Sequence, residues 1–270
     1  MNRIQKTFND LISANRAALM PYLPLGYPNR DISRELVRTM AEAGADVVEL
    51  GIPFSDPLAD GPTIQHATQV ALKNGMTVAI CLDEVKVARE AGVAIPIVLM
   101  GYYNPLLRFG VEKFVLEAVT VGADGLIVPD VPLEEAESLQ HNCDRSGLDL
   151  IYLAAPTSTG ERLKRIVDAT GAFLYLVSIA GVTGARDSLP VELDDFVRRV
   201  RAVTNKPLCV GFGISSASNA RHVAEIAEGV IVGSAIVEKI GDPSSAVLNA
   251  RRFIGELRDA IDKARIPAVQ

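Results

Sequence analysis

The chain has 270 residues, of which 49% are hydrophobic and 22% are charged, and its formal net charge is −6. This acidic balance argues against a general nucleic-acid or anionic-membrane surface, and Cys81, Cys143 and Cys209 are too scattered for a disulfide framework or a zinc site. The N-terminus lacks the apolar core of a secretory signal and no apolar run approaches the roughly 18 residues of a membrane span, so we expect a cytoplasmic protein.

Apolar, β-prone runs alternate with amphipathic stretches along the chain. This alternation predicts parallel strands joined by helices, and eight repeats match a (β/α)8 TIM barrel, with residues 1–270 as a single domain. A doubly wound open sheet is the alternative, and the absence of GxGxxG after the first run counts against it. The predicted strands are residues 18–24, 46–52, 95–101, 125–129, 149–154, 173–178, 207–212 and 229–234.

The predicted helices include several that exceed the minimal barrel plan. Residues 1–15 form an extra N-terminal helix that closes one end of the barrel, and residues 63–91 form two helices after strand 2, broken near Asn74. Residues 244–264 form a closing helix after strand 8, with Leu248 among its core-facing side chains. The remaining helices are residues 31–43, 111–121, 134–146, 161–169, 193–203 and 218–227.

One acid, Glu49, lies inside an otherwise apolar run, in the stretch VVELGIPFSDPLADG at residues 47–61. In a strand, Val48 and Leu50 share one face and Glu49 lies on the other, close to the strand's C-terminal end. A carboxylate in such surroundings is costly to bury, which favours a functional acid. The alternative is a buried acid that backbone groups or one basic partner satisfy.

Glycines follow the last two predicted strands, at Gly213 and Gly233, and Ser234 comes next. Exposed backbone N–H groups at the start of a helix bind phosphate without a lysine, and Gly184 after the sixth strand would extend such a site. The alternative is that these glycines only make tight turns.

Several reaction classes lack the residues they need. No lysine ends a predicted strand, which disfavours a Schiff-base aldolase. His66, His141 and His222 lack metal-ligand spacing, so no metal is expected, and no GxSxG nucleophile motif occurs. A carboxylate pair, Glu49 and Asp60, remains opposite the phosphate site. This pair indicates proton transfer on a phosphorylated substrate with an apolar portion.

The stretch VELGIPFSDPLADG at residues 48–61 resembles the signature of the tryptophan synthase α chain family. The resemblance covers nearly the whole chain and includes LPLGYP (23–28), YYNP (102–105), PDVP (129–132), GVTG (181–184), GFGI (211–214) and GSAIV (233–237). It implies a lyase that cleaves indole-3-glycerol phosphate to indole and glyceraldehyde 3-phosphate in tryptophan biosynthesis. It also implies an α2β2 complex with a β chain, which carries the pyridoxal phosphate, so this chain needs no cofactor of its own.

The resemblance also implies roles for single residues. The general acid/base maps onto Glu49, the acceptor for the indole N–H onto Asp60, and a supporting tyrosine onto Tyr175. The phosphate site maps onto Gly184, Gly213, Gly233 and Ser234, and the indole pocket onto Tyr22, Met100, Ile127, Leu153, Thr183 and Phe212.

Burial among apolar neighbours predicts that the pKa of Glu49 is raised towards neutrality, while Asp60 on a polar loop stays ionised. Residues 54–62 and 179–189 are expected to close over the ligand, the alternative being ordinary surface turns. Residues 53, 56, 57 and 104–108 are expected to be exposed on the same rim, and the resemblance implies that they face the β chain. Rival functions are a stand-alone indole-3-glycerol phosphate lyase, a sugar-phosphate isomerase or epimerase, and a catalytically inactive binding subunit.

Overall fold

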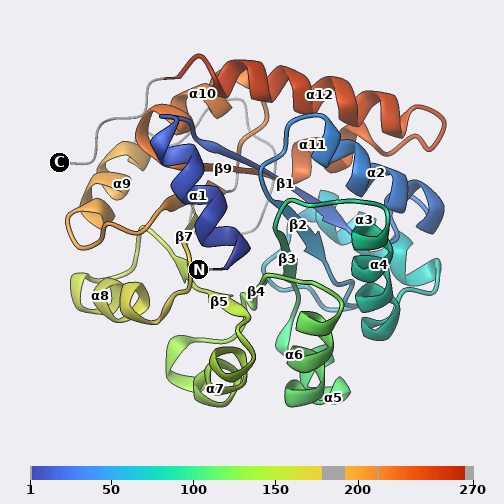
Figure 1. Cartoon of the computed structure of the whole chain (residues 1–270), viewed down its shortest axis with the longest axis horizontal. Coiled ribbons are helices and arrows are strands. Elements are labelled where there is room, and N and C mark those ends of the chain that lie inside the picture. The colour runs from blue at the N-terminus through green and yellow to red at the C-terminus, as the bar shows by residue number, and fades with distance from the viewer. Residues whose placement is uncertain (1, 178–191, 212, 265–270) are drawn as a thin grey trace.

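Parallel strands surrounded by helices form a barrel in the computed structural model, which describes residues 2–177, 192–211 and 213–264 (Figure 1). Within these ranges nine strands pair in the order β5-β4-β3-β2-β1-β9-β8-β7-β6. The strands are β1 (Ala18–Pro24), β2 (Val48–Gly51), β3 (Ile97–Met100), β4 (Gly125–Ile127), β5 (Asp149–Ile151), β6 (Leu153–Ala154), β7 (Leu174–Val177), β8 (Leu208–Gly211) and β9 (Gly229–Val232). The predicted TIM barrel is therefore confirmed.

The two ends of this strand order, β5 and β6, are neighbours in the sequence. They are parts of the one predicted strand at residues 149–154, which is interrupted at Tyr152. The Tyr152 N–H donates to Oγ1 of Thr170 at 3.0 Å, while its carbonyl accepts from the N–H of Tyr175 at 3.1 Å. The interruption explains why nine strands are found where the sequence predicts eight.

The helices surround the strands, and most of them lie in a ring (Figure 1). They are α1 (Arg3–Ser13), α2 (Arg30–Glu42), α3 (Pro62–Lys73), α4 (Val78–Glu90), α5 (Tyr103–Phe109), α6 (Val111–Thr120), the 3-10 turn η1 (Leu133–Glu135), α7 (Glu137–Ser146), α8 (Gly160–Ala169), α9 (Leu193–Arg201), α10 (Ala217–Ile226), α11 (Ser234–Lys239) and α12 (Ala246–Ile261). Extra helices after β2 and β9 are confirmed. None of the helices in the described ranges has the length and hydropathy needed to cross a bilayer.

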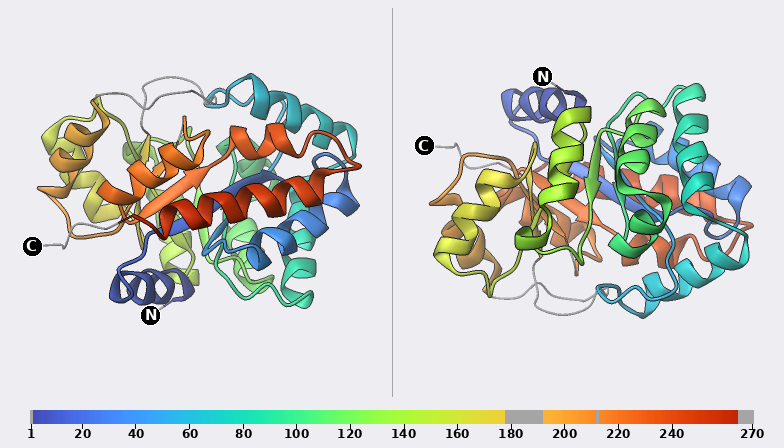
Figure 2. Two further views of the ribbon diagram at one scale, coloured as in Figure 1. Left: turned by 90° about the horizontal axis from the view of Figure 1, so that it is seen from above. Right: turned by 90° about the horizontal axis from the view of Figure 1, so that it is seen from below.

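The N-terminal helix α1 lies across one end of the barrel, as predicted (Figure 2). Asn2 caps it, accepting from the N–H of Gln5 at 2.9 Å in a capping box. Ile4 and Phe8 are buried, and the Phe8 ring packs against Phe173 with a centroid distance of 5.6 Å. This apolar contact closes the barrel at the N-terminal ends of the strands.

Three acids hold neighbouring strands together at this same end. Each accepts a hydrogen bond of 2.8 Å from a backbone N–H in the first two residues of one strand while also pairing with an arginine from a surrounding helix. The sets are Asp46 with Leu19 and Arg258, Asp124 with Ile97 and Arg89, and Glu228 with Leu208 and Arg201. We call these three sets of contacts the brace. The brace joins the strands at the N-terminal end of the barrel, opposite the C-terminal mouth, which is formed by loops.

Two further details differ from the sequence predictions. Leu248, expected to face the core, is 71% exposed because it lies on the outer face of α12, whereas Phe253 and Leu257 are buried as predicted. Helix α5 was not predicted, since seven residues are too few to display a helical periodicity.

Candidate active site

Glu49 points into the barrel, as the alternation along its strand predicts. It is the second residue of β2, where it pairs with Tyr22 of β1 and Val98 of β3. Its charge acts on Tyr175 of β7 and Cys209 of β8, which lie across the barrel. Only an inward-facing side chain reaches both of these strands.

The Glu49 carboxyl group is 1% exposed, and its Oε2 atom has no hydrogen-bond partner among the residues that the structure describes. Burial, with a contribution from the charge of Asp60, raises the pKa of Glu49 to about 8. The group is therefore protonated at neutral pH. The alternative of a backbone or basic partner that satisfies this acid finds no support among the described residues.

Asp60 approaches Glu49 from the loop between β2 and α3. It is 5% exposed, and its Oδ2 accepts a hydrogen bond from the Tyr102 hydroxyl at 3.0 Å. Burial raises the pKa of Asp60 to about 6, although the Tyr102 hydrogen bond acts in the opposite direction. The backbone carbonyl of Asp60 accepts from Nε2 of Gln65 at 2.7 Å, which anchors the end of the loop on α3. At pH 7 the two acids thus differ in protonation.

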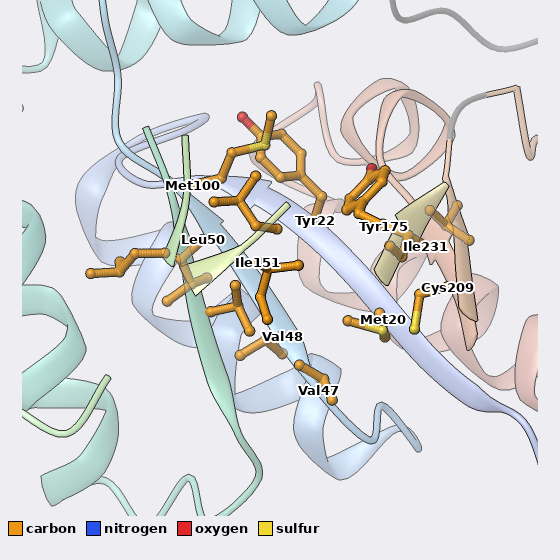
Figure 3. Packing of buried hydrophobic residues seen from close by; sticks show 14 of the residues in the cluster. Met20, Tyr22, Val47, Val48, Leu50, Met100, Ile151, Tyr175, Cys209 and Ile231 are labelled. Atoms are coloured by element: carbon orange, nitrogen blue, oxygen red, sulfur yellow. The ribbon is translucent and has the colours of Figure 1, made fainter. Parts of the chain in front are cut away.

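Two buried tyrosines, Tyr22 and Tyr175, line the interior beside the acids. Their hydroxyls point to the same side in Figure 3, and the charges of both Glu49 and Asp60 act on them, which together with burial raises the pKa of each tyrosine. Both phenols therefore stay protonated. The predicted supporting residue, Tyr175, lies where the sequence analysis expects it.

The glycines of the predicted phosphate site lie at the ends of two paired strands. Gly213 follows β8 with a φ of 80°, a conformation that favours glycine, while Gly233 follows β9 and caps α11. Ser234, which is 9% exposed, is the first residue of α11. Because β8 and β9 pair in parallel, these turns are neighbours. Gly184 lies outside the described residues.

Four predicted residues of the indole pocket can be placed. Tyr22 in the second half of β1 and Met100 at the end of β3 are nearly buried, while Ile127 at the end of β4 is fully buried. Leu153 borders a cavity of about 360 Å³ together with Pro129 and Val177. The other two predicted pocket residues, Thr183 and Phe212, lie outside the described part of the chain, as does the loop 179–189.

The rim around the mouth carries a groove and exposed leucines. The groove has a volume of about 520 Å³ and lies between the β2–α3 loop, the start of α4 and α5, where its lining includes Phe54, Asn104 and Arg108. Leu58 is 83% and Leu107 57% exposed. Pro53 and Pro57, expected to be exposed, are buried, because the loop folds these rings inward.

The three histidines lie apart on separate helices, His66 on α3, His141 on α7 and His222 on α10, as the sequence analysis expects. His222 Nε2 lies 2.8 Å from Asp194 Oδ1 on the outer helices α10 and α9. Across the described ranges, no group of three or more His, Cys, Asp or Glu side chains is placed to hold a metal ion.

Comparison with known proteins matches this arrangement to one family. The profile of the tryptophan synthase alpha chain family matches residues 8–262. The chain belongs to this family. It is 50% identical to the tryptophan synthase alpha chain of Chloroflexus aggregans over 265 residues, which is 97% of this chain and 99% of that one. It is 49% identical to the alpha chain of Roseiflexus castenholzii, covering 96% of this chain and all of the relative.

Solved structures of tryptophan synthase share the fold over nearly the full length. A chain of Mycobacterium tuberculosis tryptophan synthase is 39% identical with a TM-score of 0.89, and 96% of this chain and 98% of that chain are covered. The tryptophan synthase subunit alpha of Legionella pneumophila is 37% identical with a TM-score of 0.90, covering 97% and 99% of the two chains. The resemblance found in the sequence is thereby confirmed.

Proposed function

We propose that this chain is the α subunit of tryptophan synthase and that it cleaves indole-3-glycerol phosphate to indole and glyceraldehyde 3-phosphate. The observation that carries the proposal is the buried Glu49 carboxyl, which faces Asp60 inside the barrel and has an Oε2 atom without a partner among the described residues. An acid that is desolvated, protonated and unpaired is ready to transfer a proton to a substrate.

The reaction breaks the carbon–carbon bond between indole C3 and the side-chain carbon that bears a hydroxyl. Glu49 first gives its proton to C3, which converts the ring to an iminium form that accepts electrons. The electron pair of the breaking bond then returns to the ring, and the hydroxyl loses its proton to the Glu49 carboxylate as the aldehyde forms. One carboxyl group thus serves as acid and then as base and ends in its starting state.

Asp60 supplies the second part of the chemistry. Positive charge develops on the ring nitrogen when C3 is protonated, and an ionised carboxylate that accepts the N–H stabilises this charge. These two roles require Glu49 to be protonated while Asp60 is ionised. The pKa of about 6 for Asp60 and about 8 for Glu49 supports this order at pH 7.

The remaining predicted residues would bind the rest of the substrate. Backbone N–H groups at Gly184, Gly213, Gly233 and Ser234 would hold the phosphate, an assignment that the adjacent positions of the β8 and β9 turns support. The apolar pocket of Tyr22, Met100, Ile127, Leu153, Thr183 and Phe212 would enclose the indole, with Tyr175 beside the acids. Loops 54–62 and 179–189 would close over the bound substrate.

We also infer that the chain binds a β chain in an α2β2 complex, and that this β chain would carry pyridoxal phosphate and would join indole to serine. The rim groove beside Phe54 and Asn104, with Leu58 and Leu107 exposed next to it, supports this surface as the docking face. Docking there would order the loop that carries Asp60.

The test is to add indole-3-glycerol phosphate to the pure chain and to measure indole, with and without a β chain. Release that rises strongly on addition of the β chain supports the proposal. Full activity of the chain alone, with no effect of a β chain, would instead identify a stand-alone lyase. Absence of indole in both experiments would contradict the proposed reaction.

A further inference from the structure

The Tyr102 hydroxyl makes two hydrogen bonds to the loop that carries Asp60. It accepts from the backbone N–H of Ala59 at 3.0 Å and donates to Oδ2 of Asp60 at 3.0 Å. Because the Ala59 N–H occupies the oxygen as an acceptor, the hydroxyl hydrogen is directed at Asp60. Burial and the charge of Asp60 raise the pKa of Tyr102, so this donor does not ionise.

The Tyr102 ring is held in place by its surroundings. It is 5% exposed, and it packs on the Phe54 ring with a centroid distance of 5.5 Å. The residue directly precedes α5, whose first N–H, from Tyr103, donates to Asp130 Oδ1 at 3.0 Å on the next loop of the barrel. A side chain fixed at both its ring and its backbone can fix the group to which it donates.

The consequence for Asp60 is an asymmetric carboxylate. Oδ2 is taken by Tyr102, and within the described residues no other side chain donates to this carboxylate. Gln65 binds only the backbone carbonyl of Asp60 and so leaves the side-chain torsions free. Oδ1 is thereby left to accept a hydrogen bond from a ligand.

We propose that Tyr102 is the positioning residue that aims Oδ1 of Asp60 at the indole N–H and keeps this carboxylate ionised. The proposal rests on the function proposed above, because the N–H donor belongs to that substrate. In this role Tyr102 acts through Asp60 and not on a reacting atom. Among the titratable groups of the residues that the structure describes, Glu49 of β2, Tyr22 of β1 and Tyr175 of β7 also face Asp60, but Tyr102 is the one whose hydrogen bond to its carboxylate is seen there.

The first experiment measures kcat/KM for indole release from indole-3-glycerol phosphate between pH 5 and 9. Tyr102→Phe keeps the ring and its packing on Phe54 while removing both hydrogen bonds. At pH 7 we expect a loss of about 10- to 100-fold, and we expect the acid limb of the profile to move up by about one pH unit. The matched control is Tyr103→Phe, whose hydroxyl makes no hydrogen bond within the described residues, and its kcat/KM should stay within about two-fold of the parent.

A double-mutant cycle separates positioning of Asp60 from a general structural effect. In an Asp60→Asn background, Tyr102→Phe should change kcat/KM by less than about two-fold, because the two side chains act as one unit. An unchanged activity of the single variant, or an equal loss in both backgrounds, would overturn the proposal.

A measurement that does not depend on catalysis tests the role of Tyr102 even if the proposed reaction is wrong. The carboxyl ¹³C shift of Asp60, assigned with Asp60→Asn, should titrate at a higher pH in Tyr102→Phe than in the parent. An unmoved titration would contradict the inferred role of Tyr102. A parent chain that releases no indole, by contrast, would contradict only the proposed function.

Discussion

The Tyr22 hydroxyl occupies the place where Gly51, on the neighbouring strand, would carry a side chain. A Cβ built on Gly51 overlaps this hydroxyl and lies 2.8 Å from Cζ of the same ring. Tyr175 has the same relationship to Gly211, with Cζ at 2.6 Å from the built Cβ. Each glycine thus makes room for a tyrosine beside Glu49. Gly51 of β2 makes room for Tyr22 of β1, and Gly211 of β8 makes room for Tyr175 of β7.

Gly51→Ala should therefore disturb the site through Tyr22. The added methyl group forces the phenol to move, which we expect to lower the free energy of unfolding by about 1–3 kcal/mol and to reduce indole release. Tyr22→Phe removes the atom in closest contact, so the double variant should be less destabilised than Gly51→Ala alone. Urea unfolding of all three variants checks this, and simple additivity of the two changes would show that the clash is relieved elsewhere.

The pH dependence of kcat/KM should be bell-shaped, because Asp60 must be ionised and Glu49 protonated. Activity should fall below about pH 6 as Asp60 gains a proton and above about pH 8 as Glu49 loses one, following the raised pKa of each group. The substrate phosphate also titrates near pH 6. Asp60→Asn separates the two groups, since the fall in activity that remains at low pH in this variant belongs to the substrate.

Glu49→Gln should make the chain more stable at alkaline pH. The pKa of Glu49 is about 8 in the folded chain against 4.5 as its ordinary value, so ionisation of the unfolded state removes stability as pH rises from 4.5 to 8. Glutamine does not ionise, and the variant should gain on the order of 2–4 kcal/mol over the parent at pH 8. The difference should shrink towards pH 4.5. If the parent and Glu49→Gln were equally stable at pH 8 as well as at pH 4.5, Glu49 would not be desolvated as described.

The brace at the N-terminal end of the barrel is tested with Asp124→Ala. This change removes the partner of the Ile97 N–H at 2.8 Å and of Arg89 at 2.6 Å, both of which are largely buried. Loss of about 2–4 kcal/mol of unfolding free energy is expected. Asp83→Ala on the exposed face of α4 is the control and should stay within about 0.5 kcal/mol. A similar loss in both variants would remove the special role of the brace.

Most of the fold was predictable because its signals are local. Runs such as residues 18–24 are apolar on both faces, and the stretch 63–91 contains a break at Asn74 that separates α3 from α4 as expected. The interruption at Tyr152 could not be predicted, because it depends on a hydrogen bond to Thr170, which is distant in the sequence. The exposure of Leu248 likewise depends on which face of α12 meets the barrel.

The parts of the candidate site that depend on the alternation of side chains along a strand were predictable. Glu49 faces inward because strand residues alternate, and its raised pKa follows from apolar neighbours. The part played by Tyr102 was missed, although the motif YYNP that contains it was noted. Its hydroxyl reaches Asp60 across 42 sequence positions, and only the pairing of β2 with β3 brings the two together.

Glu49→Gln under single-turnover conditions tests the central claim most directly. Enzyme in excess over indole-3-glycerol phosphate separates substrate binding from bond cleavage. We expect the variant to bind the substrate with an affinity close to that of the parent and to release indole at least about 1,000-fold more slowly, since the amide cannot transfer the proton. Indole release at the parent rate, or a large loss of affinity with the rate preserved, would contradict proton transfer by Glu49.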